Sequence, residues 1–203
     1  MYMKKTRNPA ETKGKLLGVA QKLMLAKGYA ATSVDEICEA AKLTKGCFFH
    51  YFDSKEDLGR ALLDRFCAEG ERRRLEWMAR QPKDPLRRVY AQIDFAGSLA
   101  KECSAQGCLL GTLAQELSDT QPRFRSLCDK GFTAWSEAVA KDLREAKQAY
   151  APNAAFDPKE LAEHFIAVLE GAQLLAKMRR DCRVVARSLE HYKRYVKGLF
   201  KRS

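Results

Sequence analysis

Residues 32–55 constrain the fold more strongly than any other part of the chain. Ser33 stands before a short apolar stripe and is followed three residues later by Glu36, a spacing typical of a capping box that opens a helix. A short break ends that stripe, and Thr44, the last residue of the break, is suited to cap a second helix over residues 45–52. Two short helices joined by a tight turn predict a helix-turn-helix, whose second helix enters the major groove of DNA.

Eight positions in and around this segment carry a further signal: Ile37, Ala41, Gly46, His50, Tyr51, Phe52, Lys55 and Leu58. Together they resemble the DNA-binding signature of TetR/AcrR-type transcriptional regulators. Three residues depart from that pattern. Cys38 stands where a small residue such as alanine is usual, and Phe49 replaces a tyrosine whose hydroxyl often touches the DNA backbone. Lys42 replaces the usual turn glycine, so it carries a modest strain cost if the position keeps a positive φ.

The resemblance and the predicted helix starts give a set of candidate DNA contacts: Thr32, Ser33, Thr44, Lys45, Gly46, Cys47, His50, Tyr51 and Lys55. Lys45 is placed to reach base edges and Thr44 to reach phosphate. By resemblance, His50 and Tyr51 meet the DNA backbone, although an ordinary surface or packed histidine is the alternative for His50. Lys55 adds charge at a helix amino terminus, where amide groups already favour phosphate.

The distribution of charge agrees with a nucleic-acid partner for the amino-terminal part. The chain has a formal net charge of +11, with +5 in residues 1–55, −2 in residues 56–176 and +8 in residues 177–203. A basic amino-terminal module suits phosphate neutralisation. The basic carboxyl-terminal stretch is either a solvated helix face or an aid in approaching DNA. Residues 1–8 read as a flexible basic arm that follows a phosphate backbone or a minor groove.

Several classes of protein are excluded by what the sequence lacks. No apolar run is long enough to span a bilayer, and the amino terminus has no apolar stretch typical of a secretory signal. Seven irregularly spaced cysteines form neither a disulfide framework nor a zinc pattern, so we expect a reduced cytoplasmic setting, no membrane partner, and no metal or other cofactor. Three separated histidines, without a phosphate-binding glycine loop or a nucleophile elbow, argue against an enzyme.

Apolar residues recur at helical spacing along the whole chain, and no alternating strand pattern is present. We therefore predict an all-α fold of about nine helices. The predicted helices cover residues 9–27, 34–41, 45–52, 55–80, 85–104, 108–117, 124–150, 158–179 and 184–201. Residues 1–55 form a helix-turn-helix DNA-binding domain in this prediction, and residues 56–203 form an effector-binding and dimerisation domain.

The resemblance also implies a homodimer, in which the last two long helices of each subunit pack as a four-helix bundle. Residues at helical spacing on those helices are the candidate interface: Phe165, Leu169, Ala172, Ala176, Leu189, Tyr192 and Val196. The same spacing suits an intramolecular core, and periodicity does not separate the two. One short helix contacts only a few base pairs, so a palindromic operator with two half-sites ~34 Å apart is expected.

Cys108 and Lys177 are the candidates for an effector or sensor site. Cys108 falls in the first turn of a predicted helix, where the helix dipole lowers a thiol pKa and favours the thiolate. The stretches GCLLGTLAQELSD and GAQLLAKMRRD resemble a TetR branch in which some members sense electrophiles or oxidants and others bind small unsaturated acids. By that resemblance Lys177 matches a lysine near the sensor cysteine. The alternative is that Cys108 is a small buried hydrophobic residue.

These observations predict a dimeric repressor of transcription that binds double-stranded DNA and is released by a small effector or by modification of Cys108. Two alternatives stay open. One is a repressor that responds only to a non-covalent ligand, such as a small unsaturated acid. The other is a DNA-binding protein that does not switch, which would leave the long segment beyond the helix-turn-helix without a role.

Overall fold

The computed structural model describes residues 9–102 and 107–201, and this part of the chain is helical throughout, with no strand. The helices are α1 (Pro9–Lys27), α2 (Val34–Ala41), α3 (Lys45–Tyr51), α4 (Lys55–Met78), α5 (Pro85–Glu102), α6 (Leu109–Leu117), α7 (Pro122–Tyr150), α8 (Pro158–Arg179) and α9 (Arg183–Lys201). The predicted all-α fold is confirmed, and each predicted helix is present within a few residues of its expected ends. The predicted basic arm, residues 1–8, lies outside the described residues. None of the described helices is both long enough and apolar enough to pass through a membrane.

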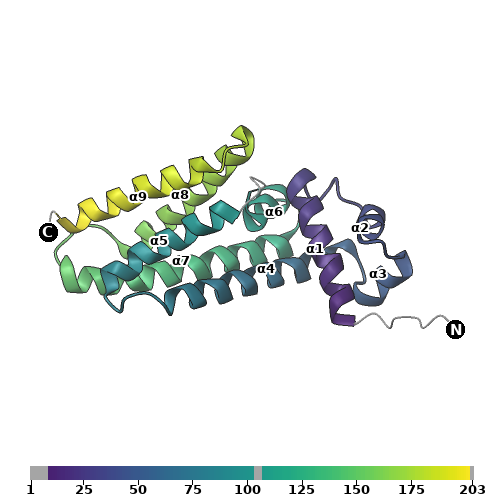
Figure 1. Ribbon diagram of the computed structural model, residues 1–203, viewed down its shortest axis with the longest axis horizontal. Helices are drawn as coiled ribbons and strands as arrows, with labels where there is room; N and C mark the ends of the chain where they lie inside the picture. The colour runs from purple at the N-terminus through teal and green to yellow at the C-terminus, as the bar shows by residue number, and fades with distance from the viewer. Residues whose placement is uncertain (1–8, 103–106, 202–203) are drawn as a thin grey trace.

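The helices form an elongated molecule with different elements at its two ends (Figure 1). The first three helices, α1 to α3, make up one end, and the carboxyl terminus lies at the other. From the end formed by α1 to α3, which we call the small end, α4 runs lengthwise beside α7. The helices α8 and α9 lie side by side along one edge. The most extensive contacts join α7 to α8 and to α5, and α8 to α9. The helix-turn-helix is therefore carried at the tip of a larger helical body.

Two clusters of buried apolar side chains hold the fold together. The first cluster joins α1, α2 and α3 to the first half of α4, to α6 and to the start of α7; it includes Leu16, Ile37, Phe48, Leu62, Leu113 and Phe124. The second joins α5, α7, α8 and α9, and includes Ile93, Leu143, Phe165 and Leu189. Because α4 and α6 belong to the first cluster, the core of the small end continues past residue 55, the predicted domain boundary.

Side chains at the predicted positions begin the two short helices. The Ser33 hydroxyl accepts a hydrogen bond from the Glu36 amide at 3.2 Å, and the Glu36 carboxylate accepts one from the Ser33 amide at 2.9 Å. This reciprocal pair is the predicted capping box. The Thr44 hydroxyl accepts from the Cys47 amide at 3.2 Å and so caps α3. Each cap contributes about 1 kcal/mol, so both helices start at defined residues.

The turn between α2 and α3 places a lysine in the left-handed region. Lys42 has φ 52° and ψ 48°. Its amide donates to the Glu39 carbonyl, and the Leu43 amide donates to the Cys38 carbonyl, both at 2.9 Å. These two bonds define a Schellman motif, which usually has glycine at the left-handed position. Residue 42 thus keeps the positive φ that a glycine would favour, so the condition for the strain cost is met.

Replacing Lys42 by glycine is expected to raise the free energy of unfolding by about 0.5–1 kcal/mol, because glycine adopts the left-handed conformation without strain. Lys42→Ala removes the same charge but keeps the strain, so it should give no gain. Urea denaturation followed by circular dichroism measures both variants. An equal gain in both would assign the effect to the lost charge instead of the backbone.

The residues predicted to form the dimer interface lie inside a single chain instead. Phe165, Leu169, Ala172, Ala176, Leu189, Tyr192 and Val196 are between 0 and 4 % exposed. They belong to the second core cluster, so no surface on them is left for a partner to cover. The interface prediction was wrong because helical spacing marks whichever face is buried, and here the chain itself buries that face.

The opposite faces of α8 and α9 carry a second set of apolar and aromatic side chains. On α8 these are His164, Ala167, Val168, Leu174, Leu175 and Met178, with Gly171 among them, and on α9 they are His191 and Tyr195, with the polar Ser188 beside them. We call this surface the α8–α9 face. Met178 is 70 % exposed and Tyr195 is 52 % exposed. Side chains from both helices line one shallow depression, so the face is continuous. Exposed apolar surface of this kind is typical of an association surface.

Candidate nucleic-acid interface and its link to the helical body

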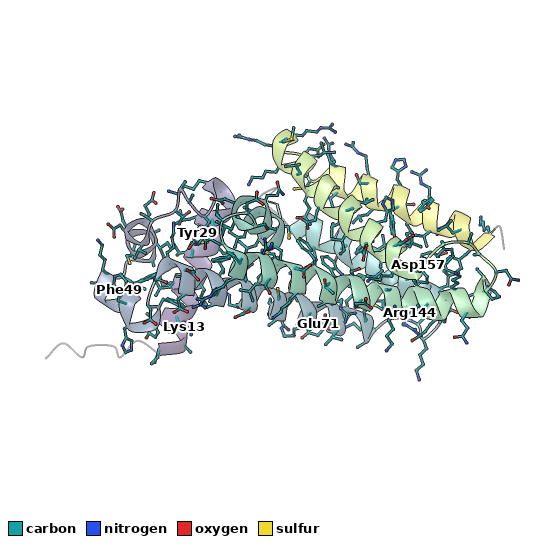
Figure 2. All side chains as sticks on the ribbon, turned by 180° about the vertical axis from the view of Figure 1, so that it is seen from behind. Lys13, Tyr29, Phe49, Glu71, Arg144 and Asp157 are labelled. Carbon is teal, nitrogen blue, oxygen red and sulfur yellow. The ribbon has the colours of Figure 1, made fainter. Side chains whose placement is uncertain are left out.

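One side of α3 faces solvent and the other faces the core. Lys45, Gly46, Phe49 and His50 are exposed, whereas Phe48 is fully buried. Residues 45 and 46 lie three or four positions before residue 49, and residue 46 lies four before residue 50, so the four exposed positions form one surface of the helix, which we call the α3 face. In Figure 2 the labelled Phe49 lies at the extreme end of the molecule. This is the surface that the second helix of a helix-turn-helix presents to the major groove.

The other predicted contacts near α3 are arranged around this face. Ser33 and Thr44 are exposed at the starts of α2 and α3, although both hydroxyls already cap their helices. Cys47 and Tyr51 are half-buried. The Tyr51 ring meets the His50 ring edge-on, with 4.9 Å between centroids. Ser33 and Thr44 thus lie beside the α3 face, while Cys47 and Tyr51 lie partly beneath it.

Thr32 and Lys55, both predicted to contact DNA, turn their side chains toward the protein. Thr32 is fully buried, and its hydroxyl donates to the Gly28 carbonyl at 2.7 Å. The Lys55 ammonium group donates to the carbonyls of Tyr29 and Thr32 at 3.0 and 2.9 Å. Partial burial lowers the pKa of Lys55. Both side chains therefore hold the turn between α1 and α2 instead of extending the α3 face.

Lys45, on the α3 face, is paired with a carboxylate of α2. Its ammonium nitrogen lies 2.8 Å from Oδ1 of Asp35, and both side chains are exposed. The hydrogen bond that Lys45 donates to Asp35 raises the pKa of Lys45, which stays charged. An exposed pair contributes little to stability. Lys45 is therefore able to exchange Asp35 for another anionic acceptor at a small cost in free energy.

A carboxylate of α6 is bonded to the turn between α1 and α2. Oε2 and Oε1 of Glu116 accept hydrogen bonds from the amides of Tyr29 and Ala30 at 2.7 and 2.6 Å. Gly28, which precedes them, has φ 89°, and a Cβ there would lie 2.9 Å from Glu116. Only glycine suits both the conformation and the close approach. Sequence reasoning missed Glu116, because a glutamate on an amphipathic helix looks like an ordinary solvated residue.

Lys177 of α8 makes a second link to the small end. Its ammonium group donates to the carbonyl of Leu25, in the last turn of α1, at 2.9 Å. A cation is favoured there by the negative end of the helix dipole. The Lys177 stem also lies beside Gly107, since a Cβ on that glycine would be 3.7 Å from Cδ of the lysine. Lys177 thus connects α1 with the residue before Cys108.

Cys108 begins α6, but its ionisation differs from the prediction. Cys108 is half-buried, and its thiol lies beside the carboxyl group of Glu170 from α8; desolvation, followed by the charge of Glu170, raises the thiol pKa well above its usual value. The prediction of a lowered pKa was wrong because desolvation and a neighbouring carboxylate outweigh the helix dipole.

Glu170 is pressed against the first turn of α6. A Cβ on Gly111 would overlap its carboxyl group, so only glycine fits at that position. Oε1 of Glu170 has no hydrogen-bond partner within the described part of the chain. Burial raises the pKa of Glu170 to about 7.

No cluster of His, Cys, Asp or Glu side chains suited to a metal ion occurs in residues 9–102 and 107–201.

Glu170 is expected to make the fold less stable at pH 8 than at pH 5. Its pKa is about 7 in the folded chain, against 4.5 for an unperturbed carboxyl. The unfolded chain therefore loses the proton first, and stability falls as the pH rises through this window. The expected loss is about 2 kcal/mol, and Glu170→Gln, which does not ionise, should abolish it. Urea denaturation at several pH values checks this; an identical pH slope in both proteins would contradict it.

The sequence matches two family models. Residues 16–62 match the model described as bacterial regulatory proteins, tetR family. Residues 85–192 match the tetracyclin repressor-like C-terminal domain. The transcriptional regulator AcuR of Cereibacter sphaeroides is 35% identical over 153 residues, which cover 75% of this chain and 70% of AcuR. The HTH-type transcriptional repressor NemR of Escherichia coli strain K12 is 28% identical over 189 residues, covering 92% of this chain and 94% of NemR.

Solved structures show the same arrangement along nearly the whole chain. A regulatory protein TetR from Rhodobacter sphaeroides superposes with a TM-score of 0.78 at 29% identity, covering 90% of this chain and 97% of that one. The reduced form of Escherichia coli NemR superposes with a TM-score of 0.70 at 27% identity, covering 90% of this chain and 96% of NemR. The similarity thus includes both the small end and the helical body.

Proposed function

Because the chain belongs to the TetR family of bacterial regulatory proteins, we propose that it is a homodimeric repressor that leaves a palindromic operator when a small molecule binds its helical body. One structural observation supports the proposal most directly. Side chains of α6 and α8 are bonded directly to the end of α1 and the turn that follows it. A conformational change in the helical body is therefore transmitted to the DNA-binding end through these three hydrogen bonds.

The α3 face supplies the main DNA contacts. Lys45 reaches base edges and Gly46 allows close approach of the helix backbone, while Thr44 and Ser33 bind phosphate oxygens through their exposed hydroxyls. His50 and Tyr51 meet the DNA backbone. Exposure of this face and the exchangeable charge of Lys45 support the assignment. Thr32 and Lys55 act indirectly, by holding the turn before α2, and the half-buried Cys47 makes at most a weak contact.

The α8–α9 face contacts a second copy of the chain. A two-fold dimer uses the same patch on both subunits, so an apolar patch that matches itself is what such an interface requires. Two helices from each subunit then form a four-helix bundle. The dimer presents two α3 faces to half-sites ~34 Å apart, which gives the affinity that one seven-residue helix lacks.

Release requires only that the effector binds one arrangement of the body better than another. Cys108 caps the start of α6 and Glu116 lies near its end, while α8 carries both Glu170 and Lys177. The same two helices thus touch the region around Cys108 and the end of α1 with the turn that follows it. A ligand that moves either helix changes the position of α1, and with it the separation of the two α3 faces.

A non-covalent ligand is the form of effector that the geometry favours. Thiols react as thiolates, and the raised pKa of Cys108 keeps its thiol protonated near neutral pH. Modification of Cys108 by an electrophile or oxidant is the second candidate, supported by the family resemblance of the surrounding stretch and by its place at the start of α6.

Binding of the purified protein to DNA flanking its own gene tests the proposal. Fluorescence anisotropy measures operator affinity with and without N-ethylmaleimide or a quinone, in the wild type and in Cys108→Ser. Sequence-specific binding is expected in both untreated proteins. Its absence in the wild type would overturn the proposed function.

The treated samples separate the two kinds of effector. Binding that persists in both proteins supports a non-covalent ligand. Binding lost in the wild type but kept in Cys108→Ser would establish the second candidate, a repressor released by modification of Cys108. Equal loss in both proteins would move the reactive group to another cysteine.

A further inference from the structure

We propose that Phe49 recognises the 5-methyl group of a thymine in the operator. This inference rests on the proposed function, because it requires the α3 face to enter the major groove. The starting observation is the side chain itself. Phe49 is 54 % exposed, although it is a large apolar residue on a short helix with a well-packed inner side. Nothing in the core requires a phenylalanine at this position.

The ring of Phe49 is directed outward by the core beneath it. It packs edge-on against the fully buried Phe48, with 5.2 Å between centroids and 81° between planes. This contact fixes the base of the ring and leaves its far edge free. Figure 2 shows Phe49 at the end of the molecule formed by α1 to α3. A groove that receives α3 therefore receives this ring.

Gly46 makes room for the approach. A Cβ at residue 46 would meet only the Thr44 hydroxyl, at 3.9 Å, so packing within the chain does not require a glycine there. The missing side chain leaves the backbone of α3 bare one turn before Phe49. Because the backbone at Gly46 has no side chain beside the exposed ring of Phe49, the edge of a base pair is able to approach both residues closely.

The chemistry of the major groove selects the partner of the ring. Thymine is the base whose groove edge carries an apolar group, its C5-methyl, and apolar side chains recognise it by contact. Phe49 has no hydroxyl to donate to a phosphate, so a backbone contact of the kind tyrosine makes is not open to it. The neighbouring Lys45 and His50 are polar and exposed, which suits a polyanion and not an apolar protein partner.

Deoxyuridine scanning of the operator tests the inference. The bound segment of the DNA flanking the chain's own gene is first located by footprinting. Each thymine is then replaced by deoxyuridine, which lacks only the methyl group. At one thymine in each half-site, the wild type is expected to lose affinity by about fourfold, the value of one buried methyl-sized group. Phe49→Ala should bind more weakly and lose nothing further at that thymine.

Two matched variants serve as controls for a general loss of DNA affinity and for loss of the aromatic ring. His50→Ala, on the same exposed surface, should lose affinity but keep its sensitivity to deoxyuridine. Phe49→Tyr keeps the ring and should also keep the sensitivity. Circular dichroism of each variant confirms that the fold is intact.

The outcomes separate this inference from the proposed function. Specific binding by the wild type that is indifferent to deoxyuridine at every thymine would overturn the role of Phe49 and leave DNA binding standing. Sensitivity that survives in Phe49→Ala would assign the methyl contact to another residue and overturn it as well. No specific binding by the wild type would overturn the proposed function and this inference together.

Discussion

Val168→Asp is expected to convert the dimer to a monomer and to lower operator affinity by at least about 100-fold. Val168 lies in the α8–α9 face, between His164 and Gly171 on α8, and lines the same depression as Tyr195 of α9. By two-fold symmetry one substitution places two aspartates in the interface. An unpaired charge buried among apolar side chains costs about 3 kcal/mol or more. A monomer then contacts one half-site only and loses the contribution of the second.

Sedimentation velocity and operator binding check this result, with Phe165→Ala as the matched control. Phe165 lies one turn before Val168 on the same helix but is fully buried within one chain. Its truncation should lower the free energy of unfolding by about 3–5 kcal/mol and leave the folded molecules dimeric. Val168→Asp should change the oligomeric state more than the stability, because Val168 is half-buried at the edge of the second core cluster and lines the surface depression. A dimeric Val168→Asp protein with normal operator affinity would show that the α8–α9 face is not the interface.

Local features of the fold were predictable because their causes are local. A capping box, a threonine cap and helical spacing of apolar residues act over a few positions, and each is present as expected at Ser33, Thr44 and along the later helices. The sequence marked residue 42 as a position that would be strained if its φ were positive, and the left-handed Lys42 meets that condition. The length and order of the helices follow from such signals alone.

Contacts between distant residues were not predictable. Glu116 lies 86 and 87 residues from the amides that it binds, and Lys177 lies 152 residues from the carbonyl of Leu25. Nothing in the periodicity of α6 or α8 distinguishes these charged residues from solvated ones. Cys108 shows the same limit: the dipole of its own helix could be inferred from sequence, but the carboxyl group of Glu170 could not. Which side of α8 and α9 meets the rest of the chain was open for the same reason.

Replacing Glu116 by alanine is expected to lower the free energy of unfolding by about 3 kcal/mol, from two charge-assisted hydrogen bonds at about 1.5 kcal/mol each. The amides of Tyr29 and Ala30 would lose their hydrogen-bond acceptors. Tyr29 also belongs to the first cluster of buried apolar side chains. Its ring packs edge-on against Phe124 of α7, with 5.3 Å between centroids. Without these hydrogen bonds, the turn between α1 and α2 no longer holds α1 in a fixed position relative to the helical body.

Operator affinity should therefore fall in Glu116→Ala by more than the unfolded fraction explains, because two loosely held α3 faces match the half-site spacing less often. Hydrogen exchange of the two amides, urea denaturation and anisotropy measure the three effects together. Glu116→Gln keeps one good acceptor and should show about half the loss of stability. Gln115→Ala, an exposed neighbour on α6, should change stability by less than about 0.5 kcal/mol. Unchanged protection of the Tyr29 and Ala30 amides in Glu116→Ala would mean that packing of the Tyr29 ring, and not the carboxylate, holds the turn and carries the coupling between body and DNA.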